Sequence, residues 1–239
     1  MKKLLDRIFI DGLGGMAQGL FATLIIGTII QQIGLFMGGG TGDLIYELGK
    51  IAAGLTGAGI GVGVARKLEA GHLVIVSAAV VGMIGAFAGK ILSGQVLVDG
   101  NLVLAGPGEP LGAFAAAYLA IEIGILISGK TKLDIILTPL VCIGTGSAVG
   151  LFVGPPISEF MLWLGSLINW GTEQQPFLMG IVVSVLMGMI LTLPISSAAL
   201  GVILNLSGLA AGAATIGCCC NMIGFAVASW RENKFSGFL

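Results

Sequence analysis

The stretch from Met187 to Trp230 constrains the fold most strongly, because it contains no charged residue. A helix on a soluble protein needs a solvated polar face, whereas a membrane span needs roughly 20 apolar residues. The stretch is too long for one span and is interrupted at Pro194. Backbone broken at membrane depth survives only where protein buries it or where it lines a wet cavity. Because broken helices recur at transporter substrate sites, we expect residues 187–230 to form a broken-helix core.

The composition extends this expectation to the whole chain. Hydrophobic residues make up 56% of the sequence and charged residues 10%, whereas a soluble domain carries about 25% charge. We therefore predict an all-α polytopic membrane protein. Its 41 glycines favour a tightly packed bundle, since small residues let membrane helices approach closely. The net charge of −1 argues against nucleic acid as a partner.

We predict a single transmembrane domain over residues 1–239, with roughly seven to eight membrane-crossing segments, some of them re-entrant or broken. Residues 1–11 are expected to form an amphipathic cytoplasmic lead-in that is retained rather than cleaved as a signal peptide. The fifth span, at about 135–153, is expected to end at Gly154, Pro155 and Pro156. The spans before the broken core are predicted at about 12–36, 44–65, 73–92, 111–128, 135–153 and 177–192.

Residues 93–110 differ from the spans around them. Apolar residues alternate around Asp99-Gly100, which is the signature of a short β-hairpin. The segment then continues into Pro107-Gly108-Glu109-Pro110, which cannot continue a helix. We predict a small extracellular β-hairpin followed by a tight turn that holds a glutamate.

Lysine and arginine predict the orientation in the membrane, because they collect in cytoplasmic loops. They occur in the N-terminus, in the 66–72 and 129–134 loops and in the C-terminus, and are missing from the 38–43, 93–110 and 154–176 connections. The N-terminus is therefore expected in the cytoplasm. An odd number of crossings must then lie between Pro176 and Trp230, as three short spans or as a re-entrant hairpin plus full spans.

Glu109 is the strongest candidate for a functional side chain. A carboxylate at the tip of a re-entrant turn could accept sugar hydroxyls or a proton, but the same turn could equally be an outer loop with a solvated glutamate. Pro110 completes that turn. Four neutral polar residues of the broken core could bind a polar solute, or could only satisfy the broken backbone: Thr192, Ser196, Ser197 and Asn205.

Glu122 lies inside the fourth predicted span, where an ionisable group is a functional candidate by default. It is expected to carry a proton or to be a structural carboxylate. The adjacent Cys218, Cys219 and Cys220 point in different directions on a helix and make a poor metal site. The sequence has one histidine, His72, and no nucleophile–His–acid set. We therefore expect neither an enzyme nor a bound metal or cofactor.

Several segments resemble the EIIC-like membrane proteins of the phosphotransferase system (PTS): GPGEPLGAF, SGKTKLDIILTPL, GLFVGPPISEFM and LTLPISSAALGVILNLSGLAAGAATIGC. More narrowly, they resemble the type-2 EIIC group, which includes a protein described as a regulator of perfringolysin expression. The resemblance implies a homodimer in the bacterial inner membrane that moves a small polar solute, such as a sugar, by an elevator-like movement. The pair Glu109-Pro110 resembles the acidic-proline motif by which sugar-transporting EIIC domains hold substrate.

The chain also departs from complete phosphotransferase systems. It contains no soluble EIIA or EIIB domain and no phosphorylatable cysteine motif in a soluble context, so phosphotransfer would need separate soluble partner chains. The resemblance also implies that family members continue beyond this C-terminus, so either a truncated form or a chain without a final helical unit is expected. A membrane-embedded solute sensor or regulator without transport is the alternative function, and a channel is a third.

Overall fold

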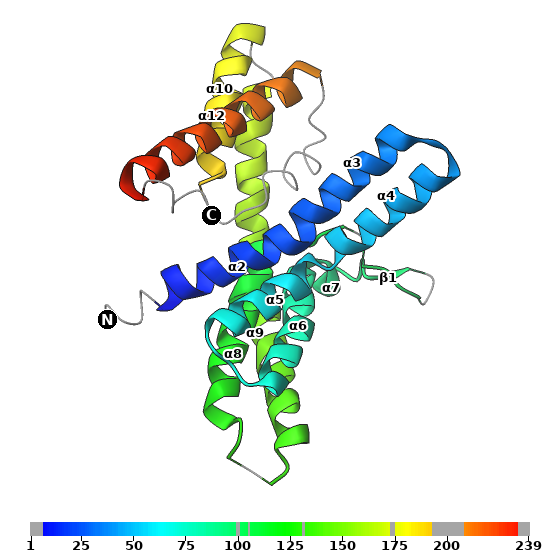
Figure 1. The fold of residues 1–239 in the computed structure, drawn as a ribbon, viewed down its shortest axis with the longest axis vertical. Coiled ribbons are helices and arrows are strands. Elements are labelled where there is room, and N and C mark those ends of the chain that lie inside the picture. The colour runs from blue at the N-terminus through cyan, green and yellow to red at the C-terminus, as the bar shows by residue number, and fades with distance from the viewer. Residues whose placement is uncertain are drawn as a thin grey trace. The chain divides into compact units, whose positions relative to one another are not determined.

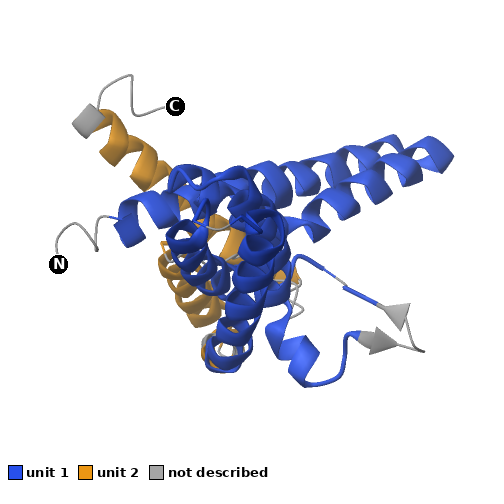
Figure 2. Cartoon of the chain, turned by 90° about the horizontal axis from the view of Figure 1, so that it is seen from below, with its two compact units in different colours: residues 1–158 blue, residues 159–239 orange. Residues whose placement is uncertain are grey.

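The computed structural model describes residues 7–98, 101–104, 106–130, 132–172, 175–192 and 208–233. The chain divides into two compact units, 1–158 and 159–239, and the boundary falls within helix α9, Asp134–Thr172 (Figure 2). Each unit is described by itself below. The prediction that 1–239 is a single transmembrane domain stays a prediction.

The first unit begins with one long helix in four consecutive segments (Figure 1). These are the π-helical η1 (Arg7–Gly12), α2 (Leu13–Leu20), the π-helical η2 (Phe21–Ile25) and α3 (Ile26–Met37). Within the predicted lead-in 1–11, residues from Arg7 onward are therefore already helical. The chain turns at Gly38, whose φ of 62° is a conformation that glycine adopts readily, and returns along α3 as α4 (Gly39–Gly54).

Several shorter helices follow. They are α5 (Thr56–Lys67), α6 (His72–Ala86), α7 (Ala88–Leu92) and α8 (Pro110–Ile127). Between α7 and α8, the two-residue strands β1 (Leu97–Val98) and β2 (Asn101–Leu102) pair antiparallel, Leu97 opposite Leu102. A small extracellular β-hairpin, including its side of the membrane, stays a prediction.

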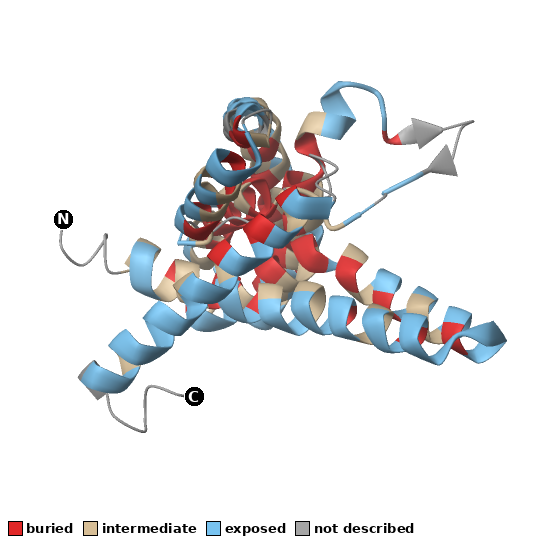
Figure 3. Cartoon of the chain, turned by 90° about the horizontal axis from the view of Figure 1, so that it is seen from above, coloured by how far each residue is buried: buried red, intermediate tan, exposed pale blue. Residues whose placement is uncertain are grey.

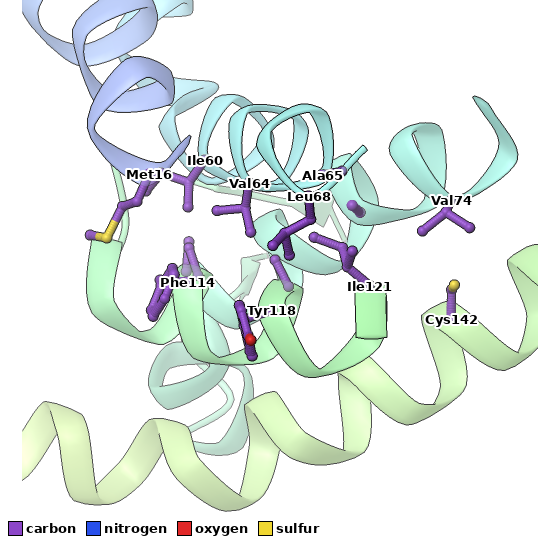
Figure 4. Packing of buried hydrophobic residues seen from close by; sticks show 14 of the residues in the cluster. Met16, Ile60, Val64, Ala65, Leu68, Val74, Phe114, Tyr118, Ile121 and Cys142 are labelled. Atoms are coloured by element: carbon purple, nitrogen blue, oxygen red, sulfur yellow. The ribbon is translucent and has the colours of Figure 1, made fainter. Parts of the chain in front are cut away.

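The core of the first unit lies where the first helix, α5, α6 and α8 meet, and Cys142 of α9 adds to it (Figure 4). Met16, Ile60 and Val64 are almost fully buried there, together with Ile121. The rings of Phe114 and Tyr118 lie one helical turn apart on α8, with centroids 5.7 Å apart. This core fixes α8, and with it the turn that precedes α8.

Glycine sets the distance between these helices. A Cβ placed on Gly15 would lie 2.6 Å from the carbonyl oxygen of Gly63 in α5, and a Cβ on Gly57 would lie 2.6 Å from that of Gly82 in α6. Real Cβ atoms essentially never come that close, so these backbones are in direct contact. The expectation of glycine-mediated close packing agrees with these contacts.

Four helices of the described chain are long and apolar enough to cross a membrane: Arg7–Met37, Pro110–Ile127, Asp134–Ile157 and Gly208–Arg231. The helices α4 and α5, bent by 50° at Leu55, make a fifth if they count as one span. Two shorter apolar helices are α6 and α10 (Pro176–Ile190). The prediction of seven to eight spans is therefore not confirmed.

The expectation that Gly154, Pro155 and Pro156 end the fifth span stays a prediction: the helix α9 continues through them to Thr172, whereas its apolar stretch of membrane-crossing length ends at Ile157. A proline inside a helix removes one backbone hydrogen bond and crowds the carbonyl one turn earlier. Prolines are nevertheless tolerated in membrane helices, where neighbouring groups satisfy the freed carbonyls. A proline pair therefore does not by itself mark a helix end.

The second unit contains the last part of α9, the helix α10 and the helix α12, Gly208–Asn233. The helices α10 and α12 pack against each other, with Gly188 of α10 close to the backbone of Gly217 in α12. Much of α12 is exposed (Figure 3). The predicted break around Pro194 lies outside the described residues.

Replacing Gly15 by alanine should destabilise the protein, because the new methyl group would meet the α5 backbone, which cannot move aside easily. Overpacking of this kind costs about 1–3 kcal/mol. The melting temperature of the purified protein in detergent measures the loss. Gly14→Ala is the matched control: its Cβ would have only the Lys67 Cε atom nearby, at 3.9 Å. Equal melting temperatures for the two variants would contradict the packing described here.

Candidate functional site

The turn before α8 is built from residues with restricted or unusual backbone angles. Gly106 and Gly108 have φ angles of 86° and 71°, which L-residues with side chains rarely adopt. Pro110 is the first residue of α8, where its missing N–H costs nothing. Glu109 is the N-cap residue, with an extended backbone. The sequence thus fixes the carboxylate at the start of a membrane-length helix.

The turn is attached to an interruption in the neighbouring helix. Phe87 separates α6 from α7, and the backbone N–H of Glu109 donates a 2.7 Å hydrogen bond to the carbonyl of Ala86. Gly108 lies so close that an added Cβ would be 2.7 Å from the Ala86 Cβ. The end of α6 and the turn before α8 are therefore held together through their backbones.

Four helices, α6, α7, α8 and α9, come close together beside this turn. A Cβ on Gly85 of α6 would lie 2.6 Å from the carbonyl oxygen of Gly112, and a Cβ on Gly112 would lie 2.7 Å from that of Gly85. From α9, Gly154 comes equally close to Ala88 of α7, since an added Cβ would be 2.6 Å from the Ala88 Cβ. The Glu109 turn consequently lies on a tightly packed base that resists local rearrangement.

The carboxylate of Glu109 is not fully satisfied by the described chain. Its Oε1 atom is buried and has no hydrogen-bond partner among the described residues. Burial raises the pKa of Glu109 to about 7, and the backbone N–H of Leu111 offsets only part of this effect. A buried carboxylate without a partner is costly. Such a group can be stabilised by a proton, or by a ligand that supplies hydroxyl hydrogens.

The other residues of the predicted site have different surroundings. Pro110 is buried next to Glu109. Thr192 is exposed after the end of α10, and its hydroxyl donates to the Met189 carbonyl at 2.6 Å. This contact agrees with the alternative in which hydroxyls satisfy nearby backbone. Thr192 belongs to the second unit and Glu109 to the first. Ser196, Ser197 and Asn205 lie outside the described residues.

Glu122 forms a side-on ion pair with Arg7. Arg7 Nε donates to Glu122 Oε1 at 2.7 Å, and Nη2 donates to Oε2 at 3.3 Å. The buried hydroxyl of Tyr118 lies one helical turn before Glu122, and no described residue forms a hydrogen bond with it. This pairing favours the structural role for Glu122 over a proton-carrying role. It also requires the start of the first helix and the later part of α8 to lie on one side of the membrane.

Sequence reasoning missed Ala86 and Phe87, which hold the Glu109 turn. No motif marks them, because Ala86 acts through its carbonyl and no proline lies near Phe87, while the flanking Gly85 and Gly89 resemble many other glycines of this chain. The pairing of Arg7 with Glu122 was missed because the two residues are far apart in the sequence. Within the described residues, no group of three His, Cys, Asp or Glu side chains could hold a metal ion.

The sequence was compared with known proteins. A family model described as "Phosphotransferase system, EIIC" matches residues 10–239. The chain belongs to this EIIC family. No curated protein and no solved structure matches it.

Membership of the EIIC family confirms the resemblance identified in the sequence. EIIC domains are membrane components of sugar transport, and other components of the system carry out phosphotransfer. The family and the apolar helices also support a multi-pass membrane protein. The chain is accordingly a membrane transport component rather than a catalytic subunit.

The raised pKa of Glu109 predicts a pH-dependent stability. Between the ordinary glutamate pKa of about 4.3 and about 7, the folded chain binds more protons at this position than the unfolded chain. The free energy of unfolding should therefore fall as pH rises through this window, by at most about 4 kcal/mol. Proton binding at Glu109 stabilises the folded protein fully at pH values below the ordinary pKa of about 4.3. This stabilisation is lost above pH 7.

The Glu109→Gln variant removes this titration. Its melting temperature should rise relative to that of the unmodified protein as pH increases from 5 to 8, because the buried amide stays neutral. Glu69→Gln, at an exposed glutamate in the loop after α5, is the control and should follow the unmodified protein. Parallel curves for Glu109→Gln and the unmodified protein would show that Glu109 is solvated.

Proposed function

We propose that this EIIC protein is a membrane permease for a small polar solute, a sugar or sugar-like metabolite, and that it works by elevator-type alternating access. The partners are separate soluble components of the phosphotransferase system and a second copy of the chain. The proposed location is the bacterial inner membrane, with the N-terminus in the cytoplasm. Family membership supports the general role in sugar transport.

One observation carries the proposed substrate class: in the part of the chain that the structure describes, the buried Oε1 atom of Glu109 has no hydrogen-bond partner. A sugar offers several hydroxyl donors, and hydrogen bonds to an ionised acceptor are stronger than neutral ones. A polyhydroxylated solute would thus supply the partner that the protein does not. An apolar solute would leave the carboxylate unsatisfied and would be rejected.

The packing around Glu109 supports a movement of large units rather than of the turn alone. The turn is bound through its backbone to α6, and glycine contacts join α6 to α8 and α7 to α9. A local opening of the turn would break these contacts. The division of the chain into two compact units is compatible with movement of one part of the protein against another.

The proposed site is completed by residues of the broken core. Thr192, Ser196, Ser197 and Asn205 would add neutral hydrogen bonds to the solute. Thr192 would have to exchange its contact with the Met189 carbonyl for one with the solute. Neutral donors and acceptors suit a sugar, which carries no charge to be neutralised.

The first test is a thermal-shift screen of the purified protein against sugars, sugar acids and other small polar metabolites, because a ligand that binds the folded state raises the melting temperature. Glu109→Gln should weaken binding of a hit by about 10- to 100-fold, since a hydrogen bond to a charged group contributes about 1.5–3 kcal/mol. Glu69→Gln should bind like the unmodified protein. Unchanged binding by Glu109→Gln would remove Glu109 from the site.

Uptake of the same solute into proteoliposomes then separates transport from sensing. Saturable uptake that is lost in Glu109→Gln supports the permease. Binding without uptake would overturn transport and favour the membrane-embedded sensor. An ion current without saturable binding would indicate a channel.

A further inference from the structure

The carboxylate of Glu109 leaves one acceptor atom open. Its Oε1 atom is buried and no described residue donates to it, although Glu109 as a whole is partly exposed. A buried acceptor without a donor is costly. A proton relieves this cost by neutralising the carboxylate, and a solute hydroxyl group relieves it by donating a hydrogen bond. These are two different occupants of one group.

The surrounding backbone keeps this carboxylate in place. The N–H of Glu109 donates to the Ala86 carbonyl at 2.7 Å, and the Glu109 carbonyl accepts from the N–H of Ala113 at 3.0 Å. Gly108 and Gly112, on either side of Glu109, both touch the backbone of α6. The turn therefore holds the carboxylate at the start of α8, and an occupant has to come to it.

Charged neighbours do not decide the ionisation of Glu109. Burial raises its pKa to about 7, the backbone N–H of Leu111 lowers it, and no described cation contributes. The ammonium group of Lys90, on α7, lies over the ring of Phe87, 5.4 Å from its centroid. The titratable side chains of the elements packed around the turn are Arg66 and Lys67 on α5, His72 on α6, Lys90 on α7, Tyr118 and Glu122 on α8, Asp134 and Cys142 on α9, and Glu159 on the part of α9 in the second unit.

The two occupants oppose each other. Hydrogen bonds to an ionised acceptor are roughly twice as strong as those to a neutral one, so a sugar binds the carboxylate better than the protonated acid. Bound hydroxyl groups in turn favour the ionised form of Glu109, and so does its place at the N-terminus of α8. Whatever favours the ionised form in the complex must displace the proton that the empty protein carries.

We propose that a proton and the solute are alternative occupants of the Glu109 carboxylate, so that binding of one neutral solute molecule releases one proton and acid weakens solute binding. The O–H bond of the protonated carboxyl group breaks, and the proton passes to water or buffer. The carboxylate that remains accepts hydrogen bonds from the solute. The proposal rests on the proposed function and adds regulation of the same site by pH.

Isothermal titration calorimetry of the purified protein with four neutral hexoses, glucose, galactose, mannose and fructose, tests the proposal. With a pKa of about 7, about nine in ten empty molecules carry the proton at pH 6 and about one in ten at pH 8. Apparent affinity falls with the fraction of molecules that are competent to bind. The dissociation constant of a hexose that binds should therefore be about tenfold larger at pH 6 than at pH 8.

Titrations in two buffers with different ionisation enthalpies count the protons released. The unmodified protein should release close to one proton per bound hexose at pH 6 and about a tenth of a proton at pH 8. Glu109→Gln should bind more weakly, with the same affinity at both pH values and no proton release, because an amide does not ionise. The matched control Glu69→Gln, at an exposed glutamate, should behave like the unmodified protein.

The possible outcomes separate this proposal from the proposed function. If a hexose binds in a Glu109-dependent manner with equal affinity at pH 6 and pH 8 and without proton release, Glu109 holds the solute but the exchange with a proton is wrong. Proton release that persists in Glu109→Gln would assign the proton to another group and would also overturn the exchange. If Glu109→Gln binds as tightly as the unmodified protein, or if none of the four hexoses binds, the proposed solute site fails and the exchange fails with it.

Discussion

Direct backbone contact between helices is the constraint on which the rest of this structure depends. Wherever Gly15, Gly57 or Gly85 meets a neighbouring helix, even one added carbon atom would collide with backbone. In lipid, packing and hydrogen bonding must hold helices together, since moving apolar side chains from lipid into a bundle gains little. The many glycines therefore provide the close fit that an apolar core provides in a soluble protein.

The Glu109 turn depends on the same constraint. Its N–H reaches the Ala86 carbonyl because α6 is interrupted at Phe87 and because Gly85 and Gly112 bring α6 and α8 together. The result is a carboxylate that the protein holds firmly by its backbone but leaves unsatisfied at Oε1. A firmly held polar group needs little reordering when it binds a partner, which favours binding.

The sequence predicted those parts of the fold that local rules control. The start of α8 followed from the Pro-Gly-Glu-Pro turn, and the predicted span 111–128 lies within one residue of Pro110–Ile127. The interruptions at Leu55 and Phe87 were not predicted, because no proline marks them and, at Phe87, the partner of the freed backbone lies on a distant turn. The sequence also did not predict that α9 continues through Pro155 and Pro156. Neighbouring helices can compensate for the backbone hydrogen bond that a proline removes, and the sequence alone does not show which helices are neighbours.

The candidate site could be predicted only in part. Glu109 was identifiable because a charged residue between two prolines is conspicuous in an apolar chain, whereas the contact between Arg7 and Glu122 depends on tertiary packing.

The helix α8 connects two of the features described above. Glu109 precedes its first residue, and Glu122, paired with Arg7, lies about 20 Å further along at 1.5 Å per residue. A straight helix transmits displacement along its axis with little loss. Glu109 and Arg7 are therefore connected through one helix: a displacement of Glu109 along the axis of α8 would also displace Arg7 at the start of η1.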